Sequence, residues 1–255
     1  MSCIEIRVLE TRGSAPREAG TRMWVSAGET RGTIGGGNLE YTALKIAREM
    51  LLSAEPLRER KFALGDSLGQ CCGGSVLLRF SRQDRMEEEF DESFQVILFG
   101  AGHVGKEVAR ILGRLPCRLT WTDSRPEQFE DSVASNTRVV IDEEASWVVD
   151  DAPPGACYLV MTHSHALDLE IVERVLRRGD YAFVGLIGSD TKAAKFRARL
   201  EARKIDCSKL VCPVGLIKAG KHPAAVAVSA VAQLLSLNET ATSDPEARVL
   251  RRSSR

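Results

Sequence analysis

Hydrophobic and polar residues alternate at the start of the chain, where Ile4, Ile6 and Val8 occupy every second position. That period is typical of a half-buried β-strand, because successive side chains of a strand point to opposite faces. Two further apolar runs predict strands at 23–25 and 75–80. The first third of the chain is therefore expected to contain a small sheet.

A helical period follows the three glycines at 35–37. Apolar residues recur three or four positions apart from Leu39 to Met50, which indicates a helix with one buried face. The side chain of Asn38 is of the kind that caps helices, so the helix is predicted to begin there and to end near Ser53. Strands with one helix give this part an α+β character.

The pattern changes after a polar, acidic stretch. Residues 83–94 offer little to bury and are predicted to be a linker. They separate a domain at 1–82 from a second domain at 95–237. The last residues, 238–255, are polar and end in a basic run, and they are expected to form a disordered tail.

Strands and helices alternate through the second domain. The short apolar run at 96–99 is typical of a parallel strand buried on both faces, and further strands are expected at 118–122, 139–141, 158–162 and 182–187. Helical spacing indicates helices at 104–115, 167–178, 193–203 and 224–237. This order predicts a doubly wound parallel sheet. The fold class is therefore α/β, with a small α+β domain followed by a Rossmann-like domain.

The composition is that of an ordinary globular protein, with 255 residues, 44% of them hydrophobic and 27% charged. Lys and Arg total 35, as do Asp and Glu, whereas a non-specific binder of nucleic acid or anionic membrane needs a basic excess. No apolar run could span a bilayer, and the first residues lack the pattern of a signal peptide. Seven cysteines without a pairing pattern are read as reduced thiols of a cytoplasmic protein.

A glycine loop at 100–105, with the sequence Gly-Ala-Gly-His-Val-Gly, lies between a predicted strand and a predicted helix. Gly100 permits a tight turn, Gly102 lets a phosphate approach the backbone, and Gly105 lets the helix pack close to its strand. Asp123 ends the next strand, where an acidic side chain can bind a ribose. Arg125 keeps a phosphorylated ligand open as an alternative. The loop therefore predicts a phosphate-bearing ligand.

Histidines at the predicted ligand edge of the sheet are further candidates. His163 and His165 follow the strand at 158–162, and His103 lies within the glycine loop. Ligands of open α/β sheets bind at the carboxyl ends of strands. His163 and His165, with Asp168, could be metal ligands or acid–base groups, or loop residues that cap the next helix.

The first domain carries two candidate features. Gly35, Gly36 and Gly37 before a helix resemble an anion-binding nest. Cys71 and Cys72 are adjacent, which disfavours a disulfide between them, and they lack zinc spacing. Glycines on both sides leave these thiols accessible, so they could bind a soft metal or accept sulfur, or they could be small apolar fillers. The isolated cysteines are read as core residues: Cys3, Cys117, Cys157, Cys207 and Cys212.

Taken together, these motifs resemble the XdhC/CoxI family, the accessory proteins of xanthine dehydrogenase maturation. The resemblance is carried, in order, by segments 11–17, 32–40, 69–74, 99–105, 162–168, 185–189, 212–216 and 221–224. Two departures stand out. Relatives commonly have a helix before the first strand, so the start of this chain is expected to be shortened. Relatives also often have His at position 38, which is Asn here.

The resemblance implies a chaperone of the molybdenum cofactor rather than an enzyme. Such proteins hold the cofactor, a pterin with a dithiolene and a phosphate, while a cysteine desulfurase replaces an oxo ligand of molybdenum with sulfido. They then deliver it to the molybdenum subunit of xanthine dehydrogenase, and they are usually dimeric. On this basis the two glycine segments, Asp123 and the three histidines are expected to bind the cofactor, with Cys71 and Cys72 beside the molybdenum.

Two other classes of protein remain open from the residues alone. An NAD(P)-dependent oxidoreductase would use the same glycine loop and Asp123, with His163 or His165 as the acid–base group. A nucleotide-binding redox sensor would use Cys71 and Cys72 as its sensing thiols.

Overall fold

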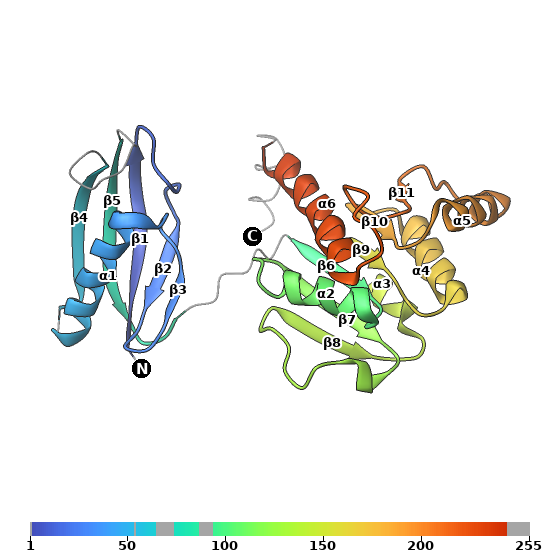
Figure 1. Ribbon diagram of the computed structural model, residues 1–255, viewed down its shortest axis with the longest axis horizontal. Helices are drawn as coiled ribbons and strands as arrows, with labels where there is room; N and C mark the ends of the chain where they lie inside the picture. The colour runs from blue at the N-terminus through green and yellow to red at the C-terminus, as the bar shows by residue number, and fades with distance from the viewer. Residues whose placement is uncertain (1, 54, 65–73, 87–93, 244–255) are drawn as a thin grey trace. The chain divides into compact units, whose positions relative to one another are not determined.

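The computed structural model divides into two compact units, Met1–Glu88 and Glu89–Arg255, each with its own sheet (Figure 1). The structure describes residues 2–53, 55–64, 74–86 and 94–243, with side chains described as far as residue 237. The predicted linker, 83–94, surrounds the division between the units.

The first unit is an antiparallel sheet with strand order β3-β2-β1-β5-β4 and one long helix. Its elements are β1 (Cys3–Arg12), β2 (Arg22–Val25), β3 (Thr30–Gly32), α1 (Gly37–Leu52), β4 (Leu57–Leu64) and β5 (Gly74–Gln83). β1 is central: Ile6 lies opposite Met23 of β2 and Phe80 of β5. The register between β1 and β5 shifts between Val8 and Glu10, as at a β-bulge.

The core of the first unit forms between α1 and one face of this sheet. Ile4, Ile6 and Val8 are at most 1% exposed, as predicted, but Glu5 between them is also buried, so the expected alternation of buried and exposed residues is incomplete. The predicted helix is present, but it begins at Gly37, and its N-cap is Gly36 rather than Asn38. Burial of the helix's apolar stripe against the sheet stabilises both elements.

The second unit is a six-stranded parallel sheet with strand order β11-β10-β9-β6-β7-β8. Its strands are β6 (Gln95–Phe99), β7 (Arg118–Asp123), β8 (Thr137–Ile141), β9 (Cys157–Val160), β10 (Phe183–Leu186) and β11 (Leu210–Val211). Its α-helices are α2 (His103–Leu112), α3 (Val148–Asp151), α4 (His165–Arg178), α5 (Asp190–Ala202) and α6 (Pro223–Ser243). This arrangement confirms the Rossmann-like fold. The strand order reverses between β6 and β9, which is where such sheets bind ligands.

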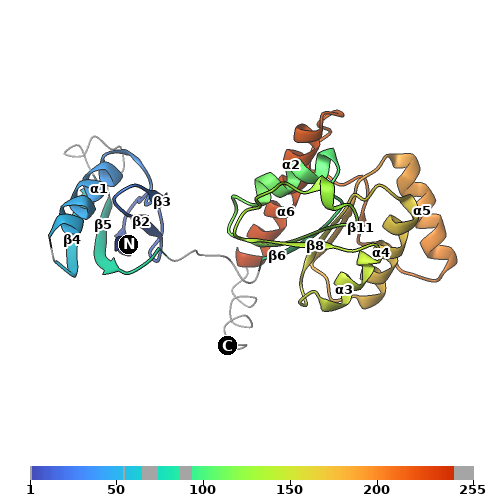
Figure 2. The ribbon, with the colours of Figure 1, turned by 90° about the horizontal axis from the view of Figure 1, so that it is seen from below.

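Helices cover both faces of the parallel sheet. Val96 and Leu98 of β6 pack in one cluster with α2 and α6. Ile97 and Phe99 point the other way and pack with α3, α4 and α5. Figure 2 shows α2 and α6 on one face and α3 and α4 on the other. The inner strands β6, β9 and β10 are buried on both sides, which explains their apolar runs in the sequence, whereas the residues of the edge strand β8 are half-buried or exposed.

The boundaries of several segments differ from the predictions. Phe94, placed in the linker, is 4% exposed and packs in the core of the second unit. α6 extends to Ser243, so the first residues of the predicted tail, 238–243, are helical. Residues 244–255 lie outside the described part of the chain. Among the described residues, no helix is long and apolar enough to cross a membrane.

Candidate functional site

The glycine loop between β6 and α2 contains three glycines with different surroundings. Gly100 has a φ of 113°, and a Cβ atom there would lie 2.3 Å from the carbonyl oxygen of Met161. A Cβ atom on Gly105 would lie 2.1 Å from the carbonyl oxygen of Gly100. At Gly102, by contrast, a Cβ atom would meet nothing within 4 Å, and φ is an ordinary −73°. Packing therefore requires two of these glycines, whereas Gly102 borders open space.

The first turn of α2 has no side-chain cap. Gly102 is the N-cap residue and has no side chain to accept a hydrogen bond. The neighbouring helices α4 and α5 are capped by the hydroxyls of Ser164 and Ser189, each of which accepts a hydrogen bond from a backbone amide. The backbone amides of the first turn of α2 begin at the exposed His103 and have no side-chain cap. Such uncapped amides are suited to bind an anion.

Asp123, predicted to bind a ribose, has both carboxylate oxygens engaged within the protein. Oδ2 accepts a hydrogen bond from the amide of Ala101 at 2.7 Å. The guanidinium of Arg125 donates to Oδ1 at 2.8 Å and to Oδ2 at 2.9 Å. Burial alone would raise the pKa of Asp123, but the hydrogen bonds from Arg125 and Ala101 outweigh it and lower the pKa. Asp123 thus fixes the glycine loop to the end of β7.

The histidines beside the glycine loop are exposed, and neither caps the next helix. His163 lies after β9, and His165 is the first residue of α4, whose cap is Ser164. The interpretation of these histidines as helix caps is therefore wrong. No group of three or more His, Cys, Asp or Glu side chains that could hold a metal ion occurs within the described ranges. The metal-ligand interpretation of His163, His165 and Asp168 thus has no support from their geometry.

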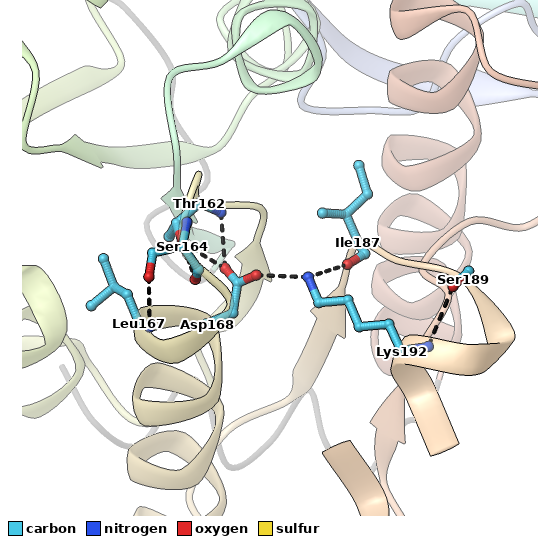
Figure 3. A network of polar contacts seen from close by, with 7 residues as sticks. All are labelled: Thr162, Ser164, Leu167, Asp168, Ile187, Ser189 and Lys192. Atoms are coloured by element: carbon cyan, nitrogen blue, oxygen red, sulfur yellow. Dashed lines mark hydrogen bonds and ion pairs between the residues drawn. The ribbon is translucent and has the colours of Figure 1, made fainter. Parts of the chain in front are cut away.

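Asp168 forms a buried ion pair with Lys192, a residue that no sequence motif indicated (Figure 3). Its Oδ1 accepts hydrogen bonds from the amide of Thr162 at 3.0 Å and from the Thr162 hydroxyl at 2.7 Å. Its Oδ2 accepts from the ammonium of Lys192 at 2.7 Å, which also donates to the carbonyl of Ile187 at 3.0 Å. The pair joins α4 to α5 and fixes the ends of β9 and β10.

Lys192 could have been noticed from its position in the sequence. It lies three residues after Ser189, the N-cap of α5, and so belongs to the first turn of that helix. An isolated lysine in a first turn is nevertheless indistinguishable from a surface lysine until its partner is known.

The three glycines at 35–37 all have positive φ, and the chain supplies an anion to this segment itself. The Oε2 atom of Glu40 accepts hydrogen bonds from the amides of Ile34 at 3.2 Å and Gly36 at 3.0 Å, and from the Thr33 hydroxyl at 2.5 Å. An external anion at these two amides would have to displace Glu40. The predicted nest is therefore, at least at these two amides, a local structural motif.

The candidate thiols, Cys71 and Cys72, lie outside the described residues, so their role stays a prediction. The isolated cysteines are all free and buried, which confirms them as core residues. Burial raises the pKa of Cys157 to about 11, so this thiol is protonated at neutral pH.

Three loops meet at the carboxyl edge of the parallel sheet. Gly100 lies against Met161, and Asp123 is bonded to Ala101, so the segments after β6, β7 and β9 come together. A hollow of about 370 Å³ lies at the opposite edge, where it is lined by the first residues of β6, β7 and β8, and it is not part of this site. These features define a Rossmann-like domain with an uncapped helix start at its switch point.

Comparison with known proteins identifies the family. Residues 96–234 match the XdhC Rossmann domain, and residues 2–61 match the XdhC and CoxI family. The chain therefore belongs to the XdhC and CoxI family.

Individual relatives are more distant. An uncharacterized protein of Escherichia coli (strain K12), YqeB, is 25% identical over 250 residues, which are 92% of this chain and 43% of that protein. The chain thus spans less than half the length of this relative. A crystal structure of a xanthine dehydrogenase from Bacillus halodurans superimposes with a TM-score of 0.73 at 19% identity, covering 97% of this chain and 95% of that one. It shows that the whole two-unit fold is shared.

Proposed function

We propose that this protein binds the molybdenum cofactor through its phosphate at the start of α2 and delivers it to apo-xanthine dehydrogenase. The cofactor is then cargo, and the protein is an accessory factor rather than the catalyst. Family membership supports the maturation role. The open space beside Gly102 is the observation that supports this site for the phosphate.

The charges around the loop are compatible with a phosphate. The amide of Ala101 already bonds Asp123, so a phosphate would bind the amides of the first turn of α2, beginning with His103. Arg125 neutralises the carboxylate of Asp123, which limits its repulsion of an incoming anion. The missing Cβ of Gly102 lets the anion reach the backbone.

A nicotinamide dinucleotide fits this site less well. Its ribose would need a carboxylate at the position of Asp123, but that side chain is 2% exposed and holds both Ala101 and Arg125. Binding a ribose would therefore require these hydrogen bonds to break. A phosphate would leave these hydrogen bonds intact, because it would bind the first-turn amides of α2, which do not bond Asp123.

Gly102→Val tests the phosphate site. The backbone at this position has an ordinary φ and a Cβ atom there meets no protein atom within 4 Å, so the fold should be retained. Its side chain would occupy the space of the anion and remove hydrogen bonds to a charged group. These are worth about 1.5–3 kcal/mol each, so cofactor affinity should fall roughly 10-fold or more. Gly28→Val is the matched control, because that position is also open and has no positive φ.

The measurement is cofactor retained per protein after purification, together with circular dichroism of each variant. Retention should fall in Gly102→Val and stay unchanged in Gly28→Val. A folded Gly102→Val protein that retains cofactor like the wild type would show that the phosphate binds elsewhere.

Delivery is tested by mixing the loaded protein with apo-xanthine dehydrogenase. The dehydrogenase should gain activity faster than with an equal amount of free cofactor, because the protein protects the cofactor and releases it at the acceptor. Pre-incubation with a cysteine desulfurase and cysteine should raise the activity gained. Equal activation by free cofactor would refute the chaperone role without bearing on the binding site.

Cys71 and Cys72 are proposed to lie near the molybdenum, where soft thiolates suit a metal with sulfur ligands. Each is replaced by Ser singly and together, and bound molybdenum and reactivation are measured separately. Loss of molybdenum indicates anchoring, whereas loss of reactivation alone indicates a role in sulfur transfer or protection. If the double variant behaves like the wild type, the thiols are structural.

A further inference from the structure

A hollow of about 330 Å³ lies beside the first turns of α5, away from the glycine loop and one strand further along the carboxyl edge. His165, at the start of α4, lines one side of it. Thr191, Lys195 and Arg199 of α5 line the other, and the buried ring of Phe196 also contributes. The three α5 residues follow one another at intervals of four, so they share one face of the helix.

The hollow is positively charged. None of the described residues that line it is acidic. The remaining lysine in its wall, Lys192, directs its ammonium to the buried Asp168 and lies 5.3 Å from the centre of the Phe196 ring. Because Lys192 neutralises Asp168, that carboxylate does not offset the charge of Lys195 and Arg199.

Lys195 and Arg199 differ from most nearby arginines in having no ion pair among the described residues. On the adjacent helix, Arg174 pairs with Asp150, and Arg177 pairs with Glu173. Two like charges four residues apart on a helix repel each other, which destabilises the helix by a few tenths of a kcal/mol. An anion placed between them would remove this repulsion.

We propose that this hollow is a second anion site, which binds the phosphate group of a small molecule. Arg199 can donate two parallel hydrogen bonds to phosphate oxygens, and Lys195 contributes a point charge. The hydroxyl of Thr191 and the ring of His165 complete a set of donors around the hollow. Its volume is at the lower end of small-molecule sites, which suits a phosphate and part of its substituent. This site uses α5, not α2, so it does not depend on the proposed cofactor site.

The test is a titration of the full chain with inorganic phosphate and, separately, with ADP, followed by backbone amide NMR shifts. Both probes should shift the amides of His165, Thr191 and Lys195. The double variant Lys195→Gln/Arg199→Gln should raise the dissociation constant at these amides at least tenfold. Lys209→Gln is the control: it removes the positive charge of an exposed lysine outside the hollow, and it should leave binding unchanged.

The two probes distinguish the sources of phosphate. Tighter binding of ADP would indicate that the hollow also contacts the substituent, and equal binding would indicate recognition of the phosphate alone. Two results would overturn the proposal: shifts absent from these amides, or equal weakening in Lys209→Gln and in the double variant. Loss of the same shifts in Gly102→Val would also overturn it, because the probes would then be binding at the glycine loop.

Discussion

Removing the ammonium of Lys192 should strongly destabilise the second unit. The Asp168 side chain is fully buried, and that of Lys192 is 12% exposed. Lys192→Met keeps the aliphatic stem but leaves a buried carboxylate without its counter-charge. Breaking a buried pair in this way costs about 3–5 kcal/mol. In a unit of this size each kcal/mol lowers the melting temperature by about 2–4 °C, so a fall of roughly 6–20 °C is expected.

A second substitution in this experiment removes the negative charge of Asp168, which Lys192→Met leaves unpaired. Asp168→Asn keeps an oxygen that can accept from Thr162 but carries no charge. The double variant Asp168→Asn/Lys192→Met should therefore be more stable than Lys192→Met alone. The difference between the double variant and the sum of the two single changes gives the coupling energy of the pair.

The assay is differential scanning calorimetry of the full chain, reading the transition of the second unit. Lys195→Met is the control: it lies on the same helix, is exposed and has no ion pair among the described residues, so it should change stability by at most about 0.5 kcal/mol. The reasoning is refuted if Lys192→Met shifts the transition no more than this control. It is also refuted if the double variant is no more stable than Lys192→Met.

Three further predictions concern the glycine loop, its carboxylate and a buried thiol. Gly105→Ala should destabilise by about 1–3 kcal/mol, because its Cβ would overlap the carbonyl of the loop, whereas Gly102→Ala should not; urea unfolding of both variants checks this. The lowered pKa of Asp123 contributes stability that is present above its ordinary value of 3.8 and lost as the pH falls through the lowered value. In Asp123→Asn the free energy of unfolding should therefore depend less on pH below about pH 4, as measured by acid titration followed by circular dichroism. An unchanged pH dependence would contradict the role of Arg125. Cys157, with a pKa of about 11, should resist alkylation at pH 8 in the folded protein, and rapid modification found by mass spectrometry would show that it is accessible.

Most of the parallel sheet was predictable because the apolar pattern of each element lies within a short stretch of sequence. The inner strands β6, β9 and β10 are buried on both faces, so each appears as an apolar run, and the longer helices appear as apolar stripes. The edge strand β4 was missed for the opposite reason. Most of its residues are exposed, and only Phe62 and Leu64 are buried, so the segment has the polar composition of a loop.

The start of α1 shows a different limit of sequence reasoning. Asn38 has a favourable capping side chain, yet the helix begins one residue earlier. Glu40 bonds the amides of Ile34 and Gly36 and so holds the turn before the helix in place. The glycines adopt the positive φ that this turn requires, and local capping preference is overridden.

The sequence by itself determined where in the fold the candidate site residues lie. The glycine loop, Asp123 and the histidines were placed at the ends of strands, because loop position follows from the order of elements. The tertiary structure alone decided which partners these groups contact. Asp123 binds the loop because folding brings it to Ala101, 22 residues away in sequence. Asp168 likewise meets Lys192 across 24 residues. A hydrogen bond or ion pair depends on ångström-scale distances between distant segments, which periodicity and spacing along a chain do not encode.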